Sequence, residues 1–316
     1  LVIPALENQA VLEALEGYSR ETGTLLIFDR QVYELSASKK KSDRFFMENQ
    51  IPAPRPYPDC GFPVIAKPSG RSGSEGVTLF NSKEALEARP DCLAGDYVIQ
   101  DYLEGRSFSI EVVGWGARYN VLQITEIIVD GGYDCKQVVA PADISEEAEQ
   151  AFREIALRLA EKLQIKGIFD IEVIQDKGGL KVLEIDARLP SQTPISVYHS
   201  TGVNMLKLMA EAATGSVKKV EARAERVCLL QQVAVSPNRA EILGEHIMAA
   251  AGPLKRIPGF FGADEGLTNY CEGSRQWTAT LILTGKTEAR ARARLARVID
   301  CIRESSRMDG VRQEAI

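Results

Sequence analysis

Two short acidic segments carry the residue types best suited to chemistry in this sequence. Asp170 and Glu172 lie two residues apart inside one apolar run, and Glu184 and Asp186 lie two residues apart inside the next. Side chains two apart on a β-strand share a face, so each segment predicts a strand that presents two carboxylates on one side. The same alternation predicts that Leu183 faces the opposite side.

The segment between these strands decides how the carboxylates face one another. A three-residue loop over residues 177–179 would set Asp170 opposite Asp186 and Glu172 opposite Glu184. Four carboxylates on one face repel one another unless a cation lies near them. Mg²⁺ binds carboxylates together with substrate phosphates. The hairpin therefore predicts a magnesium site, and the alternative is a solvated sheet face.

Three cationic residues have the spacing to serve a phosphorylated substrate. Arg188 follows Asp186 by two residues, where a positive charge suits a transferring phosphoryl group. Lys67 ends a predicted strand, and Lys39 begins a predicted helix 28 residues earlier (67 − 39 = 28). A solvated basic helix start is the alternative for Lys39.

The loop after Lys67 has the composition of a phosphate-binding loop. Its small residues are Ser69, Gly70, Ser72, Gly73, Ser74 and Gly76. Glycine lets backbone N–H groups approach phosphate oxygens closely. The G-x-x-x-x-G-K-[ST] pattern is absent, so this is not a P-loop. A flexible surface hairpin is the alternative.

A strand that passes into an extended linker follows at residues 100–105. Such a segment can present backbone N–H and C=O groups to the edge of an adenine base. A core strand followed by a turn is the competing interpretation.

The elements that position these residues follow from periodicity and local signals. Residues 146–163 show the clearest helix, because Phe152, Ile155, Leu159 and Leu163 recur at spacings of three and four. Ser38 predicts the N-cap of a helix that ends before residue 51, since Pro52 follows. Further helices are predicted over 13–21 and 288–303. Strands are predicted over 1–4, 24–28, 63–67, 77–80, 97–100, 107–113, 119–130, 168–175, 180–186, 227–235 and 278–284.

Composition narrows the function classes. The chain has 316 residues, of which 45% are hydrophobic and 26% charged, as in ordinary globular proteins. A net charge of −6 argues against general binding to nucleic acid or anionic membranes. Six cysteines without a C-x-x-C pair and only two histidines make a zinc site improbable. We therefore expect a cytoplasmic protein with reduced thiols.

The chain begins at Leu1 with a strand-like apolar run rather than with methionine. We therefore expect the sequence to be a fragment that lacks an N-terminal part.

The order of these motifs resembles the ATP-grasp superfamily. That order is a lysine, a second lysine with a glycine and serine loop, a hinge, and the D-x-E … E-x-D-x-R hairpin. The resemblance implies an α/β protein with two α+β lobes that clasp ATP. The implied units are the remnant of an N-terminal α/β domain over 1–32, a small lobe over 33–98, a large lobe over 99–215, and a C-terminal α/β extension over 216–316 that completes the large lobe.

Within this superfamily the chain is more closely similar to the ligases of pyrrolysine biosynthesis. The similarity lies in residues 38–42, residues 133–135 and the run from Leu183 to Pro194. It implies an ADP-forming ligase that joins (3R)-3-methyl-D-ornithine to the ε-amine of L-lysine, with ATP and Mg²⁺, through an acyl-phosphate.

The resemblance also implies a role for each candidate residue. Lys39 and Lys67 would hold ATP phosphates under a loop containing Ser69, Ser72, Ser74 and Gly76, and Gln100, Asp101 and Leu103 would form the adenine hinge. Asp170, Glu184 and Asp186 would bind Mg²⁺, and Arg188 would stabilise the acyl-phosphate. The amino-acid pocket would contain Glu7, Asn8, Glu111, Tyr133, Asp134, Ser191, Gln192 and Thr193, with Asp134 pairing with an ammonium group.

Three other functions stay open at this point. One is an ATP-grasp ligase with another pair of amino acids, and another is a regulatory module that binds ATP without turnover. Arginines at 290, 292, 294 and 297 raise a third, RNA binding, but no aromatic platform accompanies them.

Overall fold

The computed structural model describes residues 1–216, 219–237 and 239–311. Residues 217–218, 238 and 312–316 of the expected C-terminal extension lie outside this description. Across the described ranges, no helix combines the length and apolar character that a membrane crossing requires.

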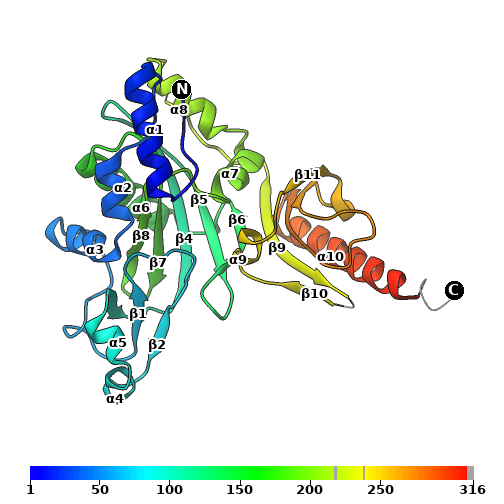
Figure 1. Ribbon diagram of the computed structural model, residues 1–316, viewed down its shortest axis with the longest axis horizontal. Helices are drawn as coiled ribbons and strands as arrows, with labels where there is room; N and C mark the ends of the chain where they lie inside the picture. The colour runs from blue at the N-terminus through cyan, green and yellow to red at the C-terminus, as the bar shows by residue number, and fades with distance from the viewer. Residues whose placement is uncertain (217–218, 238, 312–316) are drawn as a thin grey trace.

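Two antiparallel sheets organise the chain. The small sheet has the strand order β2–β1–β3 and lies at the lower left of Figure 1 with two short helices. Its elements are β1 (Val64–Pro68), β2 (Thr78–Phe80), α4 (Lys83–Glu87), α5 (Pro90–Ala94) and β3 (Tyr97–Asp101).

The large sheet has ten strands in the order β11–β12–β13–β9–β6–β5–β4–β7–β8, with β10 paired to β9. Its first half contains β4 (Arg106–Trp115), β5 (Arg118–Val129), β6 (Cys135–Ala140), β7 (Gly167–Asp176) and β8 (Gly179–Asp186). Its second half contains β9 (Val227–Ser236), β10 (Arg239–Ile242), β11 (Lys255–Pro258), β12 (Glu265–Thr268) and β13 (Trp277–Gly285). Because β9 pairs with β6, the C-terminal residues extend the same sheet that carries the acidic hairpin.

Helices cover the large sheet and join it to the small one. The helices before and around the first half are α1 (Gln9–Thr22), α2 (Arg30–Ser36), α3 (Lys39–Glu48) and α6 (Glu146–Leu163). The later ones are α7 (Thr193–Thr201), α8 (Met205–Ala213), α9 (His246–Ala249), the 3₁₀ turn η1 (Phe260–Gly262) and α10 (Glu288–Val311). Figure 1 shows α10 extending along the second half of the sheet, far from α1 and the N-terminus.

The strongest local signals gave the expected helices. Helix α6 has the predicted bounds, and Phe152 and Leu159 of its stripe are fully buried in the main core. Ser38 caps α3 by accepting a hydrogen bond from the backbone N–H of Lys41. The helix ends at Glu48, before Pro52. Both predictions are confirmed.

The expected strands at residues 1–4 and 24–28 are wrong as strands. The two segments meet only at a single parallel bridge between Val2 and Leu26. One bridge fixes neither segment as part of a sheet, although Ile27 is buried against the core of the large sheet.

The acidic hairpin has the expected register, but its turn and its strand pairing differ from the prediction. Asp170 pairs with Asp186 and Glu172 pairs with Glu184, as predicted. The turn, however, spans two residues rather than three, because Asp176 pairs with Gly179. A bulge at Leu183 supplies the missing residue and restores the register.

Candidate active site

Two adjoining cavities lie between the small sheet and the large one. The first has a volume of about 350 Å³, and the second of about 160 Å³. Seven residues line both: Gly73, Ser74, Ile127, Val129, Tyr133, Glu172 and Glu184. The carboxylates of the hairpin are thus part of the boundary between the two spaces.

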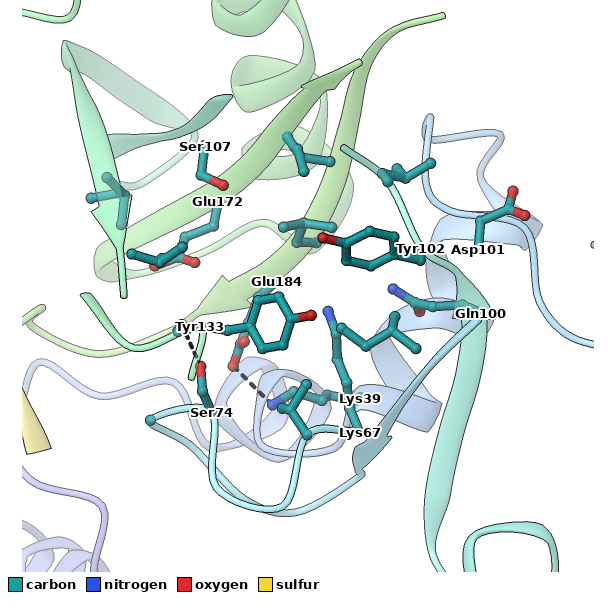
Figure 2. Close-up of a pocket in the computed structure, with 18 of the residues that line it drawn as sticks. Lys39, Lys67, Ser74, Gln100, Asp101, Tyr102, Ser107, Tyr133, Glu172 and Glu184 are labelled. Carbon is teal, nitrogen blue, oxygen red and sulfur yellow. Dashed lines mark hydrogen bonds and ion pairs between the residues drawn. The ribbon is translucent and has the colours of Figure 1, made fainter. Parts of the chain in front are cut away.

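Two lysines enter the first cavity from different elements. The Nζ atom of Lys39, at the start of α3, lies 3.3 Å from Oε1 of Glu184 and donates to the carbonyl of Arg71 at 2.8 Å. Lys67 reaches the same space from β1 and makes no ion pair among the described residues (Figure 2). Burial lowers the pKa of Lys67, and Glu184 opposes that shift. A buried ammonium without a bonded anion is suited to receive a phosphate.

The loop between β1 and β2 lies over the junction of the cavities. The Ser74 hydroxyl donates to the carbonyl of Tyr133 at 2.7 Å, which joins this loop to the large sheet (Figure 2). The Ser72 hydroxyl donates to Glu7 at 3.1 Å. Gly76 has a φ of +76°, and a Cβ there would lie 2.9 Å from the ring of Pro68, so the turn requires glycine. Ser69 is buried and lines neither cavity, because it accepts a hydrogen bond from the backbone of Lys40.

The predicted hinge borders the first cavity. Gln100 is 3% exposed, and Asp101, Tyr102 and Leu103 continue along the same wall. Asp101 bonds outward to the guanidinium of Arg55, with 2.9 Å between Oδ2 and Nε. Leu183 lines this cavity too, so the expectation that it faces away from Glu184 is wrong. The bulge is the cause, since an extra residue breaks the alternation of a strand.

Carboxyl groups form two rows across three strands. Asp186, Asp170 and Glu111 are neighbours on β8, β7 and β4, and Glu184 and Glu172 form the second row, which ends at Ser109. The Ser109 hydroxyl lies 3.2 Å from Oδ2 of Asp170. The other oxygen of Asp170 is buried without a hydrogen-bond partner among the described residues.

Burial and mutual repulsion favour the protonated form of these groups. Burial, with the charges of Asp186 and Glu172, raises the pKa of Asp170 well above its usual range. Burial and Glu184 raise the pKa of Glu172 to about 8, and burial raises that of Asp186 to about 7 against the opposing charge of Arg188. An all-oxygen donor set with one orphaned buried oxygen fits a divalent cation, which would remove the repulsion.

Arg188 lies next to this donor set. Its Nη2 lies 2.7 Å from Oδ2 of Asp186, and its Nε lies 2.5 Å from Oε1 of Glu7. Burial lowers the pKa of Arg188, but the charges of Asp186 and Glu7 outweigh that effect and raise it. Glu7 therefore joins the N-terminal segment both to Arg188 and, through Ser72, to the loop above the cavities.

Comparison with known proteins places this geometry in a family. A family model described as an ATP-grasp domain matches residues 36–192. A 3-methyl-D-ornithine–L-lysine ligase of Methanosarcina acetivorans is 34% identical over 294 residues, which are 92% of this chain and 77% of the relative. The ligase of the same name from Methanosarcina barkeri is 32% identical over 306 residues, 96% of this chain and 80% of the relative. The chain belongs to the ATP-grasp family.

Solved structures agree with this fold. A biotin carboxylase domain of a 2-oxoglutarate carboxylase from Hydrogenobacter thermophilus, in complex with MgADP, has a TM-score of 0.72 at 16% identity and covers 92% of this chain and 72% of its own. An L-amino acid ligase from Bacillus licheniformis has a TM-score of 0.65 at 17% identity, with 95% and 85% covered. The predicted ATP-grasp fold is confirmed, and the chain is an ADP-forming carboxylate–amine ligase of a family that binds ATP with Mg²⁺.

The fold brings part of the predicted amino-acid pocket together. Tyr133, Asp134, Ser191, Gln192 and Thr193 all line the second cavity. Asp134 was expected to pair with an ammonium group. Its carboxylate accepts a hydrogen bond from the backbone N–H of His246 at 3.0 Å and contacts the imidazole of the same residue at 2.5 Å.

Two predicted pocket residues, Glu111 and Asn8, line neither cavity, and one residue that was not predicted lines the second. Glu111 is fully buried and lines neither cavity, and burial raises its pKa to about 7. Asn8 caps α1 through its side chain. Glu245, which no sequence signal marked, lines the second cavity from the turn before α9.

Proposed function

We propose that this chain joins (3R)-3-methyl-D-ornithine to the ε-amine of L-lysine in the biosynthesis of pyrrolysine, with ATP converted to ADP and phosphate. The proposal rests on the named relatives at 32–34% identity and on the charge of the second cavity. Six carboxyl side chains line that cavity. Among the described residues that line it, Arg188 carries the only lysine or arginine side chain. Such a space suits substrates that carry amines and one reactive carboxylate.

We assign ATP to the first cavity. Lys39 and Lys67 would bind the phosphates, with Ser72, Ser74 and Gly76 in the loop above them and Ser69 supporting that loop from beneath. Gln100, Asp101 and Leu103 would border the adenine. This assignment is supported by the two ammonium groups that face one cavity from separate elements.

We assign Mg²⁺ to Asp170, Glu184 and Asp186. When bound, the ion would offset negative charge on the phosphates and among the carboxylates. The residues of the chain supply the remaining requirements of the reaction. Arg188 would bind the carboxylate to be activated and the phosphoryl group it receives.

The proposed chemistry has two steps. A carboxylate oxygen of the ornithine-type substrate attacks the γ-phosphorus of ATP, and the bond to the bridging oxygen of ADP breaks. The unprotonated ε-amine of lysine then attacks the acyl carbon, and the bond from that carbon to the phosphate oxygen breaks. The attacking nitrogen loses one proton to a base, which leaves the neutral amide. The site must exclude water between the two steps, because water would also attack the acyl-phosphate. The contacts of Ser74 with Tyr133 and of Ser72 with Glu7 hold the loop over the junction of the cavities.

Isotope exchange within ATP tests the first step. ATP labelled in the oxygen that bridges the β- and γ-phosphorus should scramble its label into the non-bridging β positions with D-ornithine or its 3-methyl form and without lysine. After the transfer, the β-phosphate of the bound ADP is terminal and can rotate. When the transfer reverses, a different β-oxygen can become the bridging one. Arg188→Ala should slow scrambling by on the order of 100-fold, since it removes charge stabilisation from the transfer.

The outcomes separate the competing functions. Scrambling with lysine alone would show that lysine is the activated acid. Scrambling with a different amino acid only would support another substrate pair. Tight ATP binding without scrambling or phosphate release under any condition would support a regulatory module.

A further inference from the structure

We propose that Glu245 of the C-terminal extension binds the side-chain ammonium of the diamino acid whose carboxylate is activated. This inference rests on the proposed function and names the residue that selects its first substrate. Three observations support it. Glu245 lies in the second cavity, its carboxylate is held by hydrogen bonds through one oxygen, and the other acids of this cavity have partners or another assignment.

Glu245 is held from the core of the protein. Its Oε2 accepts hydrogen bonds from the Ser191 hydroxyl at 3.1 Å and from the Gln192 amide. Gln192 in turn accepts from Gln232 at 2.9 Å, and Gln232 accepts from the hydroxyl of Thr280 at 2.7 Å. Gln232 and Thr280 are buried on the neighbouring strands β9 and β13. The carboxylate is therefore positioned by the sheet and not only by its own short turn.

One oxygen of Glu245 stays available to a ligand. Oε1 has no hydrogen-bond partner in the part of the chain that the structure describes, while Oε2 accepts both hydrogen bonds, from Ser191 and from Gln192. A carboxylate that is held through one oxygen and keeps the other free toward a cavity is a receptor for an ammonium group.

The other acids of the second cavity have partners or another assignment. Asp134 is bonded to His246, Asp186 to Arg188, and Glu184 to Lys39. Asp170 has one buried oxygen without a hydrogen-bond partner among the described residues, and we have assigned this carboxylate to Mg²⁺. Glu172 lies in the wall that the two cavities share, beside the carboxylates assigned to the cation.

The loop after β8 sets the spacing between the two ends of the substrate. Arg188 lies at its start and Gln192 near its end, and both line the second cavity. A carboxylate at Arg188 and an ammonium at Glu245 would thus be the two ends of one amino acid. An amino acid without the side-chain amine would leave Glu245 in the cavity without its partner, which is the penalty that creates specificity.

The test compares D-ornithine with D-norvaline, which has the same carbon chain but no side-chain amine. Binding of each to the protein with Mg-ADP is measured by calorimetry, and amide formation with ATP and lysine is measured as kcat/KM. Wild-type protein should prefer D-ornithine. Glu245→Gln should weaken D-ornithine by about 10- to 100-fold, mainly in KM, and change D-norvaline by less than about threefold.

Two variants control for structural effects. Glu241→Gln alters a nearby carboxylate on β10 that pairs with Arg239 at 2.7 Å and lies outside both cavities, so the preference should stay as in wild type. Glu245→Asp keeps the charge and should retain more of the preference than Glu245→Gln. Thermal unfolding confirms that each variant is folded.

Several results would overturn the inference. A preference that survives in Glu245→Gln, an equal loss for both amino acids, or a loss confined to the KM of lysine would each contradict it. Wild-type protein that binds D-ornithine no better than D-norvaline would do the same. Wild-type protein that shows the expected binding but no turnover with any diamino acid and lysine would reject the proposed function and leave the ammonium site supported.

Discussion

The two cavities share a wall of carboxylates but differ in the charge that faces it. The first has Lys39, Lys67 and Arg71 along its lining together with five acids, and the second has six acids and, among the described residues, Arg188 as its one basic side chain. We therefore propose phosphates for the first side, where two lysines enter, and amines for the second. On this proposal a single hairpin serves both a phosphoryl transfer and the capture of an amine, because Lys39 and Lys67 face it on one side only.

The largest effect is expected from the acidic hairpin. Glu184→Gln and Asp186→Asn should lower ligation by at least about 100-fold, because a lost metal contact costs several kcal/mol in the transition state. Removal of Mg²⁺ by a chelator should stop product formation in wild-type protein. Amide formation with ATP, D-ornithine and lysine is the measurement.

Asp176→Asn is the matched control for these two variants. Asp176 lies on the same hairpin, but its side chain accepts a hydrogen bond from Gly178 in the turn, outside both cavities. Full activity of Glu184→Gln and Asp186→Asn at saturating Mg²⁺ would remove the hairpin from the chemistry.

A smaller effect should be confined to the first cavity. Lys67→Ala and Lys39→Ala should raise the Kd of ATP by about 10- to 100-fold, since each removes a charged hydrogen bond to phosphate. The KM of the ornithine-type substrate should change little. Lys40→Ala is the control, because Lys40 pairs with Asp96 at 2.9 Å and does not line the first cavity. Equal effects at Lys39, Lys40 and Lys41 would indicate a general basic patch instead.

The smallest effect is expected at Asp134. Its bonds to His246 tie the turn before β6 to α9, so Asp134→Asn should lower the free energy of unfolding by about 1 kcal/mol. The KM of D-ornithine should rise less than in Glu245→Gln, and the Kd of ATP should not change. Chemical denaturation and initial rates measure these quantities. A KM effect larger than that of Glu245→Gln would show that Asp134 is the direct ammonium partner.

The hairpin shows how far the sequence could be interpreted. Alternation placed Asp170 and Glu172 on one face correctly, because a strand has a period of two. The loop length was wrong, and so was the side to which Leu183 points. A bulge adds a residue without a local sequence signal, since its cost is compensated by pairing with the neighbouring strand.

The substrate side was less accessible to sequence reasoning. Glu111 and Asp170 are cross-strand neighbours, yet one is fully buried and the other lines a cavity. Which member of a row meets the cavity depends on the elements that cover the sheet, and these are remote in the chain.

The sequence by itself determined the parts that depend on local pattern. Helix α6, the Ser38 cap, the strands of the hairpin and the order of the ATP-grasp motifs all follow from residue spacing within single segments. Only the tertiary structure decided that β9 joins β6, and thereby that Glu245 lies beside Ser191 and Gln192. Glu245 is one ordinary acid among the 44 Asp and Glu residues of the sequence. Its position comes from the packing of strands distant in the chain, which no local periodicity encodes.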